Sequence, residues 1–130
     1  MITNKNRFSK SERLCSKKAI EALFQNGKSF YCSPFLIVWA YSNSDTPFPA
    51  QVAFSIPKKG FKLAVTRNLI KRRTREAYRV HKAILYDILH SKEKKIVFTM
   101  IFRDNSIPDY ITVENSVKEM IKMFARTLEQ

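Results

Sequence analysis

The spacing of apolar residues along the chain predicts a mixture of helical and extended segments. Apolar residues recur at helical spacing in three segments, which are 16–26, 66–90 and 112–128. Runs rich in β-branched and aromatic residues, which favour strands, occupy 34–41, 51–56 and 95–102. The coarse order is therefore helix, strand, strand, helix, strand, helix. This order predicts an α+β fold with one small sheet and helices packed against it.

Capping and turn-forming residues set the predicted boundaries of these segments. Ser16 is expected to cap the first helix, and Asn26 followed by Gly27 to end it. Thr66 is expected to cap the long second helix. Residues 42–50 are rich in turn formers, and they predict a hairpin loop between the first two strands.

Two segments carry patterns that predict burial. The strand at 34–41 does not alternate apolar with polar residues, so both of its faces should be covered. The last helix carries an apolar stripe that is typical of a core-facing side rather than of a cofactor site, formed by Val113, Val117, Met120, Ile121 and Phe124. Between residues 51 and 102 a helix connects two strands, and the statistical default for such a crossover is right-handed.

Composition narrows the possible functions. A chain of 130 residues with 45% hydrophobic residues has the size of a single domain, 1–130. Its 24 Lys and Arg against 11 Asp and Glu give a formal net charge of +13, which favours a polyanionic partner and nucleic acid first. Residues 1–15 form a basic N-terminal arm. No apolar run approaches the roughly 18 residues of a membrane span, and no signal-peptide core is present, so we expect a soluble, cytoplasmic protein without a membrane partner.

Residue types that bind metals or perform catalysis are scattered. Cys15 and Cys32 form no paired zinc motif, and His81 and His90 match no metal-ligand spacing. The aspartates lack the clustering that a two-metal phosphodiesterase needs. We therefore expect no metal site and no catalytic residue in the protein itself.

The segment 61–79 gathers cationic residues on one side of the predicted helix. On a helical wheel, seven polar residues fall within an arc of roughly 140°, at Arg67, Asn68, Lys71, Arg72, Arg75, Arg79 and Lys82. The opposite side is expected to face the core through Leu69, Ile70, Ala77, Val80 and Ile84. Arg73 falls within the apolar arc, and this arrangement does not explain it.

Two interpretations of this cationic side compete. Most charged helix faces are simply solvated, but such faces usually mix signs, whereas Glu76 is the only acid against ten Lys and Arg between residues 58 and 82. Like charges four residues apart repel by roughly a few tenths of a kcal/mol, so an anionic partner explains the face better. Arg offers a rigid fork for phosphate oxygens and Lys a point charge. Because base readout in DNA uses a more mixed set of side chains, we expect RNA rather than DNA.

The same segment resembles the signature of a known family. It matches the RNR motif of the bacterial ribonuclease P protein family at eight positions, which are Ala64, Val65, Arg67, Asn68, Lys71, Arg72, Arg75 and Glu76. Upstream, VAFSIPKK at 52–59 is similar to the family's strand that ends in paired basic residues. Near the start the resemblance includes Arg7, Phe8, Ile20, Phe24 and Gly27. It spans most of the chain, although residues 103–130 match by pattern rather than by motif.

The resemblance implies a particular fold. The family has a two-layer α+β sandwich of order αβββαβα, which is ribosomal protein S5 domain 2-like. Its crossover into the RNR helix is left-handed, against the statistical default. The family's third strand would be one of the runs above or a short additional piece.

The resemblance also implies two RNA-binding surfaces. The RNR helix and the preceding turn would dock the catalytic RNA of ribonuclease P through Lys58, Lys59, Arg67, Asn68, Lys71, Arg72, Arg75 and Arg79. A cleft between the first helix and the sheet would hold the single-stranded 5′ leader of precursor tRNA through Ile20, Phe24 and Val38. Val38 stands where the family often has an aromatic residue. The alternatives are that Asn68 is an ordinary polar residue and Phe24 a core residue.

The implied reaction is endonucleolytic removal of the leader, catalysed by the RNA with its bound Mg²⁺. The protein would reduce electrostatic repulsion and hold the leader. The alternative is a general RNA-binding or ribosomal-type protein without a role in tRNA processing.

Overall fold

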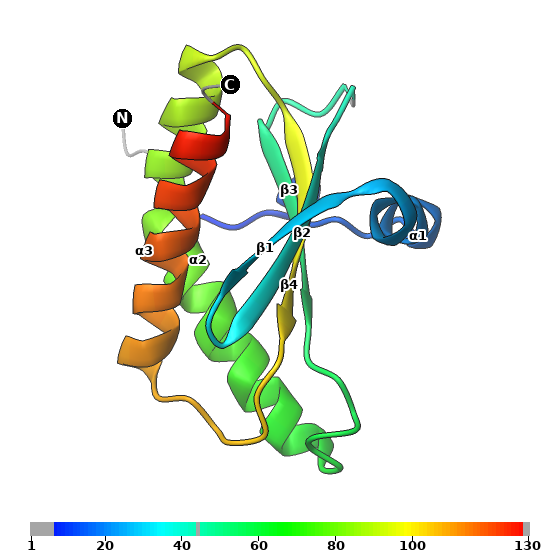
Figure 1. The fold of residues 1–130 in the computed structure, drawn as a ribbon, viewed down its shortest axis with the longest axis vertical. Coiled ribbons are helices and arrows are strands. Elements are labelled where there is room, and N and C mark those ends of the chain that lie inside the picture. Colours follow the sequence, from blue (N-terminus) through cyan, green and yellow to red (C-terminus); the bar gives the residue numbers. More distant parts are fainter. Residues whose placement is uncertain (1–6, 44, 129–130) are drawn as a thin grey trace.

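A four-stranded sheet forms the centre of the structure, a computed structural model that describes residues 7–43 and 45–128. The elements in chain order are the short 3-10 helix η1 (Lys10–Glu12), α1 (Lys17–Asn26), β1 (Lys28–Cys32), β2 (Phe35–Tyr41), β3 (Ala50–Ser55), α2 (Ala64–Ser91), β4 (Ile96–Phe102) and α3 (Tyr110–Thr127). In Figure 1, α2 and α3 form a layer on one face of the sheet, and α1 lies on the opposite face. The α+β class and the family order αβββαβα are confirmed.

The strand order is β1-β2-β4-β3, and it corrects the predicted hairpin. β4 lies between β2, with which it is antiparallel, and β3, with which it is parallel. The prediction of a hairpin loop at 42–50 was therefore wrong, because this segment connects two strands that do not pair. β4 takes the central place since nearly all of its residues are apolar and buried, as suits a strand covered on both faces.

The crossover from β3 through α2 to β4 is left-handed. In Figure 1, β3 and β4 both run downward, α2 returns upward on the left, and β4 lies nearer to the viewer than β3. The right-handed default was wrong for this chain, and the expectation from the family resemblance is confirmed.

β1 is the strand that the hydrophobic pattern missed. It pairs with β2 alone, so it forms an edge of the sheet, and Lys28, Ser29 and Tyr31 are exposed. A strand at an edge needs no continuous apolar run. The turn into β2 contains a cis peptide bond between Ser33 and Pro34.

Both faces of β2 are covered, as predicted. Phe35, Ile37 and Trp39 belong to the main core and are at most 2% exposed. On the other face, Val38 is 7% exposed and belongs to a second cluster beneath α1. The predicted stripe of α3 is also confirmed, because its five residues are all buried in the main core.

The helix boundaries agree with the predictions at α1 and differ at α2 and α3. The Ser16 hydroxyl accepts a hydrogen bond from the Ala19 N–H at 3.2 Å, so the predicted cap is confirmed. Thr66 is not a cap: α2 begins at Ala64, and the preceding residue has no capping side chain. α3 begins at Tyr110 because the Asp109 carboxylate accepts from the Thr112 N–H at 2.8 Å.

Gly27 ends α1 and allows the helix to lie close to the sheet. A Cβ atom at this position would lie 2.5 Å from the Leu23 carbonyl oxygen and 2.9 Å from Val38 Cγ1. Its φ of −75° is open to any residue, so the glycine is needed for close packing rather than for its backbone conformation. This packing brings α1 over Val38.

Candidate nucleic-acid interface

The buried side of α2 is rotated from the predicted apolar stripe. Ile70 and Ala77 are buried as predicted, but Val80 is 39% and Ile84 55% exposed. The buried side also includes Thr74, Tyr78, Lys82, Leu85 and Leu89. The two sides differ because Lys82, which was placed on the polar arc, is buried, and because Tyr78, Leu85 and Leu89 were not counted with the apolar side.

A cationic ridge lies along α2 next to this buried side. Five of the predicted residues share an arc of about 100° on the helix, at Asn68, Lys71, Arg72, Arg75 and Arg79. Asn68, Arg72 and Arg75 are exposed, and Lys71 and Arg79 are half-buried. Lys58 and Lys59 are exposed in the turn that precedes the helix. We call these seven residues the cationic ridge.

Arg67, a further predicted contact, is bonded to backbone carbonyl oxygens of its own chain. Its Nη1 atom donates to the carbonyl oxygens of Phe61 at 2.7 Å and Lys62 at 3.0 Å. These bonds tie the turn that carries Lys58 and Lys59 to the first turn of α2. Arg67 therefore shapes the ridge rather than standing free within it.

Arg73, which the helical wheel could not explain, has a structural contact. Its Nη1 atom donates to the Pro108 carbonyl oxygen at 2.6 Å. Pro108 lies in the loop between β4 and α3, so this bond holds the start of α3 against α2. This bond accounts for the arginine within the predicted apolar arc.

Glu76 is paired on the helix surface. Its carboxylate lies 2.7 Å from Arg79 Nη2, and hydrogen bonding from Arg79 holds the pKa of Glu76 below its ordinary value. The pair is exposed, so its contribution to stability is small. The pair nevertheless keeps the Glu76 carboxylate bound to Arg79.

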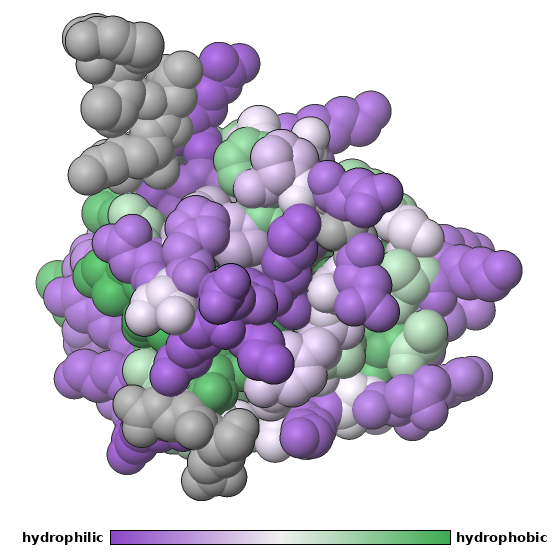
Figure 2. All heavy atoms as spheres, turned by 90° about the horizontal axis from the view of Figure 1, so that it is seen from above, coloured by the Kyte–Doolittle hydropathy of each residue, from purple (hydrophilic) through white to green (hydrophobic). Residues whose placement is uncertain are grey.

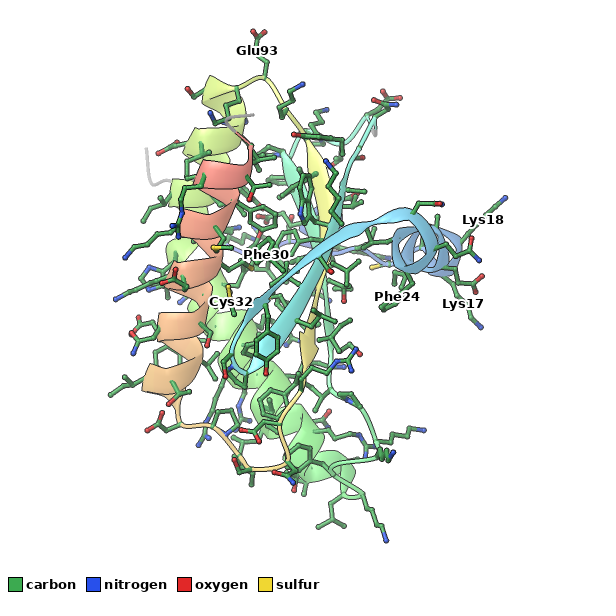
Figure 3. All side chains as sticks on the ribbon, viewed as in Figure 1. Lys17, Lys18, Phe24, Phe30, Cys32 and Glu93 are labelled. Atoms are coloured by element: carbon green, nitrogen blue, oxygen red, sulfur yellow. The ribbon has the colours of Figure 1, made fainter. Side chains whose placement is uncertain are left out.

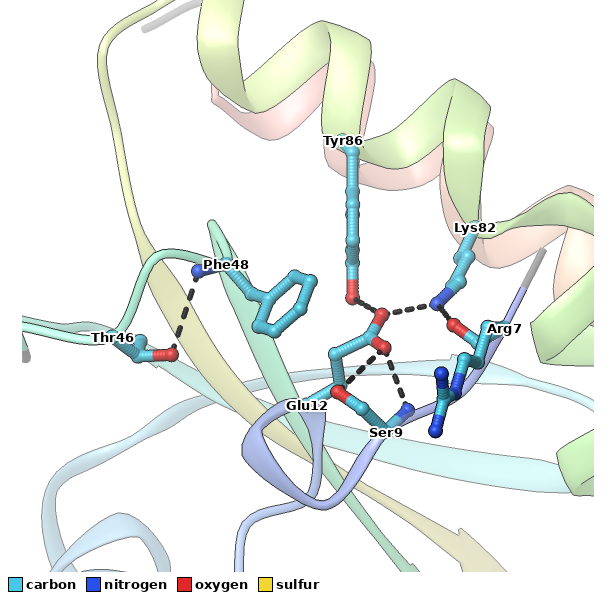
Figure 4. Close-up of polar contacts among 7 residues, drawn as sticks. All are labelled: Arg7, Ser9, Glu12, Thr46, Phe48, Lys82 and Tyr86. Atoms are coloured by element: carbon cyan, nitrogen blue, oxygen red, sulfur yellow. Dashed lines mark hydrogen bonds and ion pairs between the residues drawn. The ribbon is translucent and has the colours of Figure 1, made fainter. Parts of the chain in front are cut away.

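Lys82 is buried and does not belong to the cationic ridge, which corrects its predicted place on the polar arc. Its ammonium donates to the Glu12 carboxylate and to the Arg7 carbonyl oxygen, and both charged side chains are nearly inaccessible to solvent (Figure 4). The same carboxylate accepts from Tyr86 and from the Ser9 N–H. Burial alone would raise the pKa of Glu12, but the bonds from Lys82, Ser9 and Tyr86 outweigh burial and lower it.

The three predicted leader residues lie on the face of the sheet that α1 covers, but they differ in exposure. Phe24 is 53% exposed, and Figure 3 shows its ring projecting from α1 below the helix. Ile20 is half-buried and packs at the edge of the second core cluster. Val38 is 7% exposed and is covered by α1 at Gly27, and its place in the leader cleft stays a prediction.

Sequence reasoning missed an exposed aromatic residue on this face. Tyr31 is 56% exposed and pairs in register with Leu36, which pairs with Ile101. Paired residues of neighbouring strands lie on the same face, so Tyr31 lies on the α1 side of the sheet. The signal was weak because β1 itself was missed. Lys17 and Lys18 project outward from the first turn of α1 (Figure 3).

The described residues offer little other chemistry. Within 7–43 and 45–128, no three His, Cys, Asp or Glu side chains lie close enough together to hold a metal ion. Cys15 is exposed, and burial raises the pKa of the Cys32 thiol to about 11.

Among the described helices, none combines the length and the apolar character needed to cross a bilayer. Figure 2 shows that hydrophilic residues cover most of one end of the molecule.

Comparison with known proteins decides the family. The family model for ribonuclease P matches residues 8–127. The chain belongs to the ribonuclease P protein family. The ribonuclease P protein component of Porphyromonas gingivalis is 33% identical over 113 residues, which cover 87% of this chain and 82% of that protein. Membership in this family implies a role in tRNA processing.

Solved ribonuclease P proteins share the fold. The Thermotoga maritima protein superimposes with a TM-score of 0.69 at 22% identity, covering 86% of this chain and 96% of its own. The Staphylococcus aureus protein gives 0.68 at 22% identity, covering 86% of this chain and 94% of its own. The left-handed crossover and the strand order therefore belong to a fold shared with ribonuclease P proteins.

Proposed function

We propose that this chain is the protein subunit of a ribonuclease P holoenzyme that binds a catalytic RNA through the cationic ridge. The observation that carries the proposal is the cationic ridge itself. Its cations gather on one side of α2 and the turn before it, and Glu76, the one acid between residues 58 and 82, is paired with Arg79. Each cation that neutralises a phosphate releases counterions from the RNA. These positions match the RNR motif of the ribonuclease P protein family.

The leader of precursor tRNA lies on the other side of the sheet in this proposal, beside α1. Phe24 and Tyr31 are exposed aromatic side chains on that side, and unpaired bases stack on such rings. Lys17 and Lys18 extend from the start of α1 and supply positive charge for the leader backbone. Ile20 contributes an apolar wall, and Val38 supports α1 from beneath.

The protein contributes binding rather than bond cleavage. The proposed catalyst is the RNA with its bound Mg²⁺, which hydrolyses the phosphodiester bond at the 5′ end of the mature tRNA. The protein's positive charge lowers the repulsion between the two RNAs and holds the leader in place. Precursor tRNA is a cytoplasmic substrate in bacteria, so we place the protein in the cytoplasm.

Reconstitution tests the proposed function. The protein is mixed with the catalytic RNA from the same genome and a precursor tRNA with a labelled leader. At low Mg²⁺, the protein is expected to raise the rate of leader removal at least about tenfold, equivalent to about 1.4 kcal/mol of transition-state stabilisation. Equal rates with and without the protein would favour a general RNA-binding protein instead.

Replacing Phe24 tests the leader surface. Phe24→Ala is expected to weaken holoenzyme binding to leader-bearing precursor by about five- to tenfold, since stacking of one base contributes about 1–3 kcal/mol. Binding of mature tRNA should not change. Phe24→Tyr keeps an aromatic face and serves as the matched control. An equal loss for precursor and mature tRNA would place the leader elsewhere.

A further inference from the structure

Residues 7–14, which we call the N-terminal strap, are folded onto the edge of the sheet. The Leu14 N–H donates to the Val52 carbonyl oxygen at 2.9 Å, and Arg13 forms a parallel bridge with Val52. The Gln51 side chain donates to the Ser11 carbonyl oxygen at 3.1 Å. The strap therefore follows β3, and its side chains have defined positions.

A buried charge network fixes the strap to α2 as well. Lys82 of α2 donates to Glu12 and to the Arg7 carbonyl oxygen, and Glu12 also accepts from the Ser9 N–H at 2.8 Å (Figure 4). Because the pair is buried, a loose strap would leave a charge without its partner in the interior. The network holds Arg13 of the strap on the side of α2 that carries the cationic ridge.

The strap, β3 and α2 line an open hollow of about 190 Å³ with cations on two of its sides. Arg13 comes from the strap, and Lys71 and Arg75 come from α2. Phe8 and Phe54 supply apolar walls, and the Arg13 guanidinium lies 5.7 Å from the centre of the Phe8 ring. The hollow thus combines three positive charges with apolar walls.

These charges are not neutralised by the described part of the chain. No acidic residue lines the hollow, and Arg13, Lys71 and Arg75 form no ion pair with residues 7–43 or 45–128. The two acids nearest in sequence are committed elsewhere, Glu12 to Lys82 and Glu76 to Arg79. Like charges that converge without an acid favour the binding of an anion.

We propose that this hollow is a binding site for one phosphate of an RNA strand, held jointly by Arg13, Lys71 and Arg75. The proposal rests on the proposed function, since it assumes that RNA lies along the ridge. Arg provides a forked pair of donors for phosphate oxygens and Lys a third charge. The Glu12 and Lys82 pair positions Arg13, so the site is formed before RNA arrives. The phosphate belongs either to the catalytic RNA or to the leader.

A double-mutant cycle tests whether Arg13 and Arg75 share one phosphate. Arg13→Gln and Arg75→Gln, alone and combined, are compared with Lys122→Gln, which removes an exposed charge from α3. Each single variant of the site is expected to weaken RNA binding about tenfold, as for the loss of a charge-assisted hydrogen bond. The double variant should lose clearly less RNA affinity than the product of the two single fold-losses, since both residues bind one phosphate. If the two single fold-losses multiply in the double variant, the shared site is overturned. It is also overturned if Arg13→Gln binds RNA as well as Lys122→Gln does.

The same variants identify the source of the phosphate. Weaker binding to the catalytic RNA alone assigns the phosphate to that RNA, and weaker binding only of leader-bearing precursor to the holoenzyme assigns it to the leader. No loss in either assay overturns the proposal. Wild-type protein is assayed for leader removal in parallel, and failure of that reaction would refute the proposed function rather than this site.

Discussion

Replacing Arg72 and Arg75 together by alanine will weaken binding to the catalytic RNA by about 100-fold. Both side chains are exposed on α2, and each loses a charge-assisted contact of about 1.5–3 kcal/mol with a phosphate. The plot of log affinity against log salt should become shallower by about two, because two fewer cations pair with phosphates. Filter binding or fluorescence anisotropy over a series of salt concentrations measures both effects.

The matched control removes the same charge from another surface. Lys118 and Lys122 are exposed on α3, away from the cationic ridge in sequence and element. Lys118→Ala combined with Lys122→Ala should change affinity little. If the two double variants lose affinity equally, net charge rather than the ridge governs binding, and the docking face assigned to α2 is wrong.

Replacing Lys82 by methionine will lower the free energy of unfolding by about 3 kcal/mol. The substitution leaves the Glu12 carboxylate buried without its cation, and breaking one partner of a buried pair costs about 3–5 kcal/mol. Urea denaturation followed by circular dichroism measures the change. Adding Glu12→Leu to Lys82→Met should recover much of the loss, and additive losses would contradict a direct pairing of these two residues.

The same pair makes stability depend on pH in the acidic range. The pKa of Glu12 is lower in the folded protein than in the unfolded chain, so the folded state favours the carboxylate. Its stabilisation is therefore complete above the unfolded value of about 4.3 and is lost as the pH falls through the folded value. Glu12→Gln should flatten this part of the stability curve.

The sequence predicted the elements that have a continuous apolar pattern and missed those without one. The strands β2 and β4 and the stripe of α3 were predicted because their residues are apolar in runs or at a helical period. β1 was missed because three of its five residues are exposed at the edge of the sheet. The position of β4 between β2 and β3 could not be deduced, since pairing partners are set by tertiary packing rather than by local pattern.

The candidate site was predicted in composition but not in detail. Most of the cationic ridge follows from helical spacing alone, which is a local property of the chain. Lys82 was misplaced and the hydrogen bonds of Arg67 were not predicted, because their partners, Glu12 and the carbonyl oxygens of Phe61 and Lys62, meet them only in the folded protein. The same is true of Arg73, whose acceptor lies 35 residues away.

Directed hydroxyl-radical cleavage tests the central claim, that α2 lies against the RNA. An iron chelate is attached to a single cysteine at Val65, which is 72% exposed beside Asn68 and Arg72, or at Lys122 on α3, with Cys15→Ser in both proteins. Cys32 is buried with a raised pKa and should not react. The chelate at position 65 should cut the catalytic RNA strongly at a few sites, and the chelate at position 122 should cut it weakly. Strong cutting from position 122 with none from position 65 would contradict the assignment of α2 as the RNA-binding face.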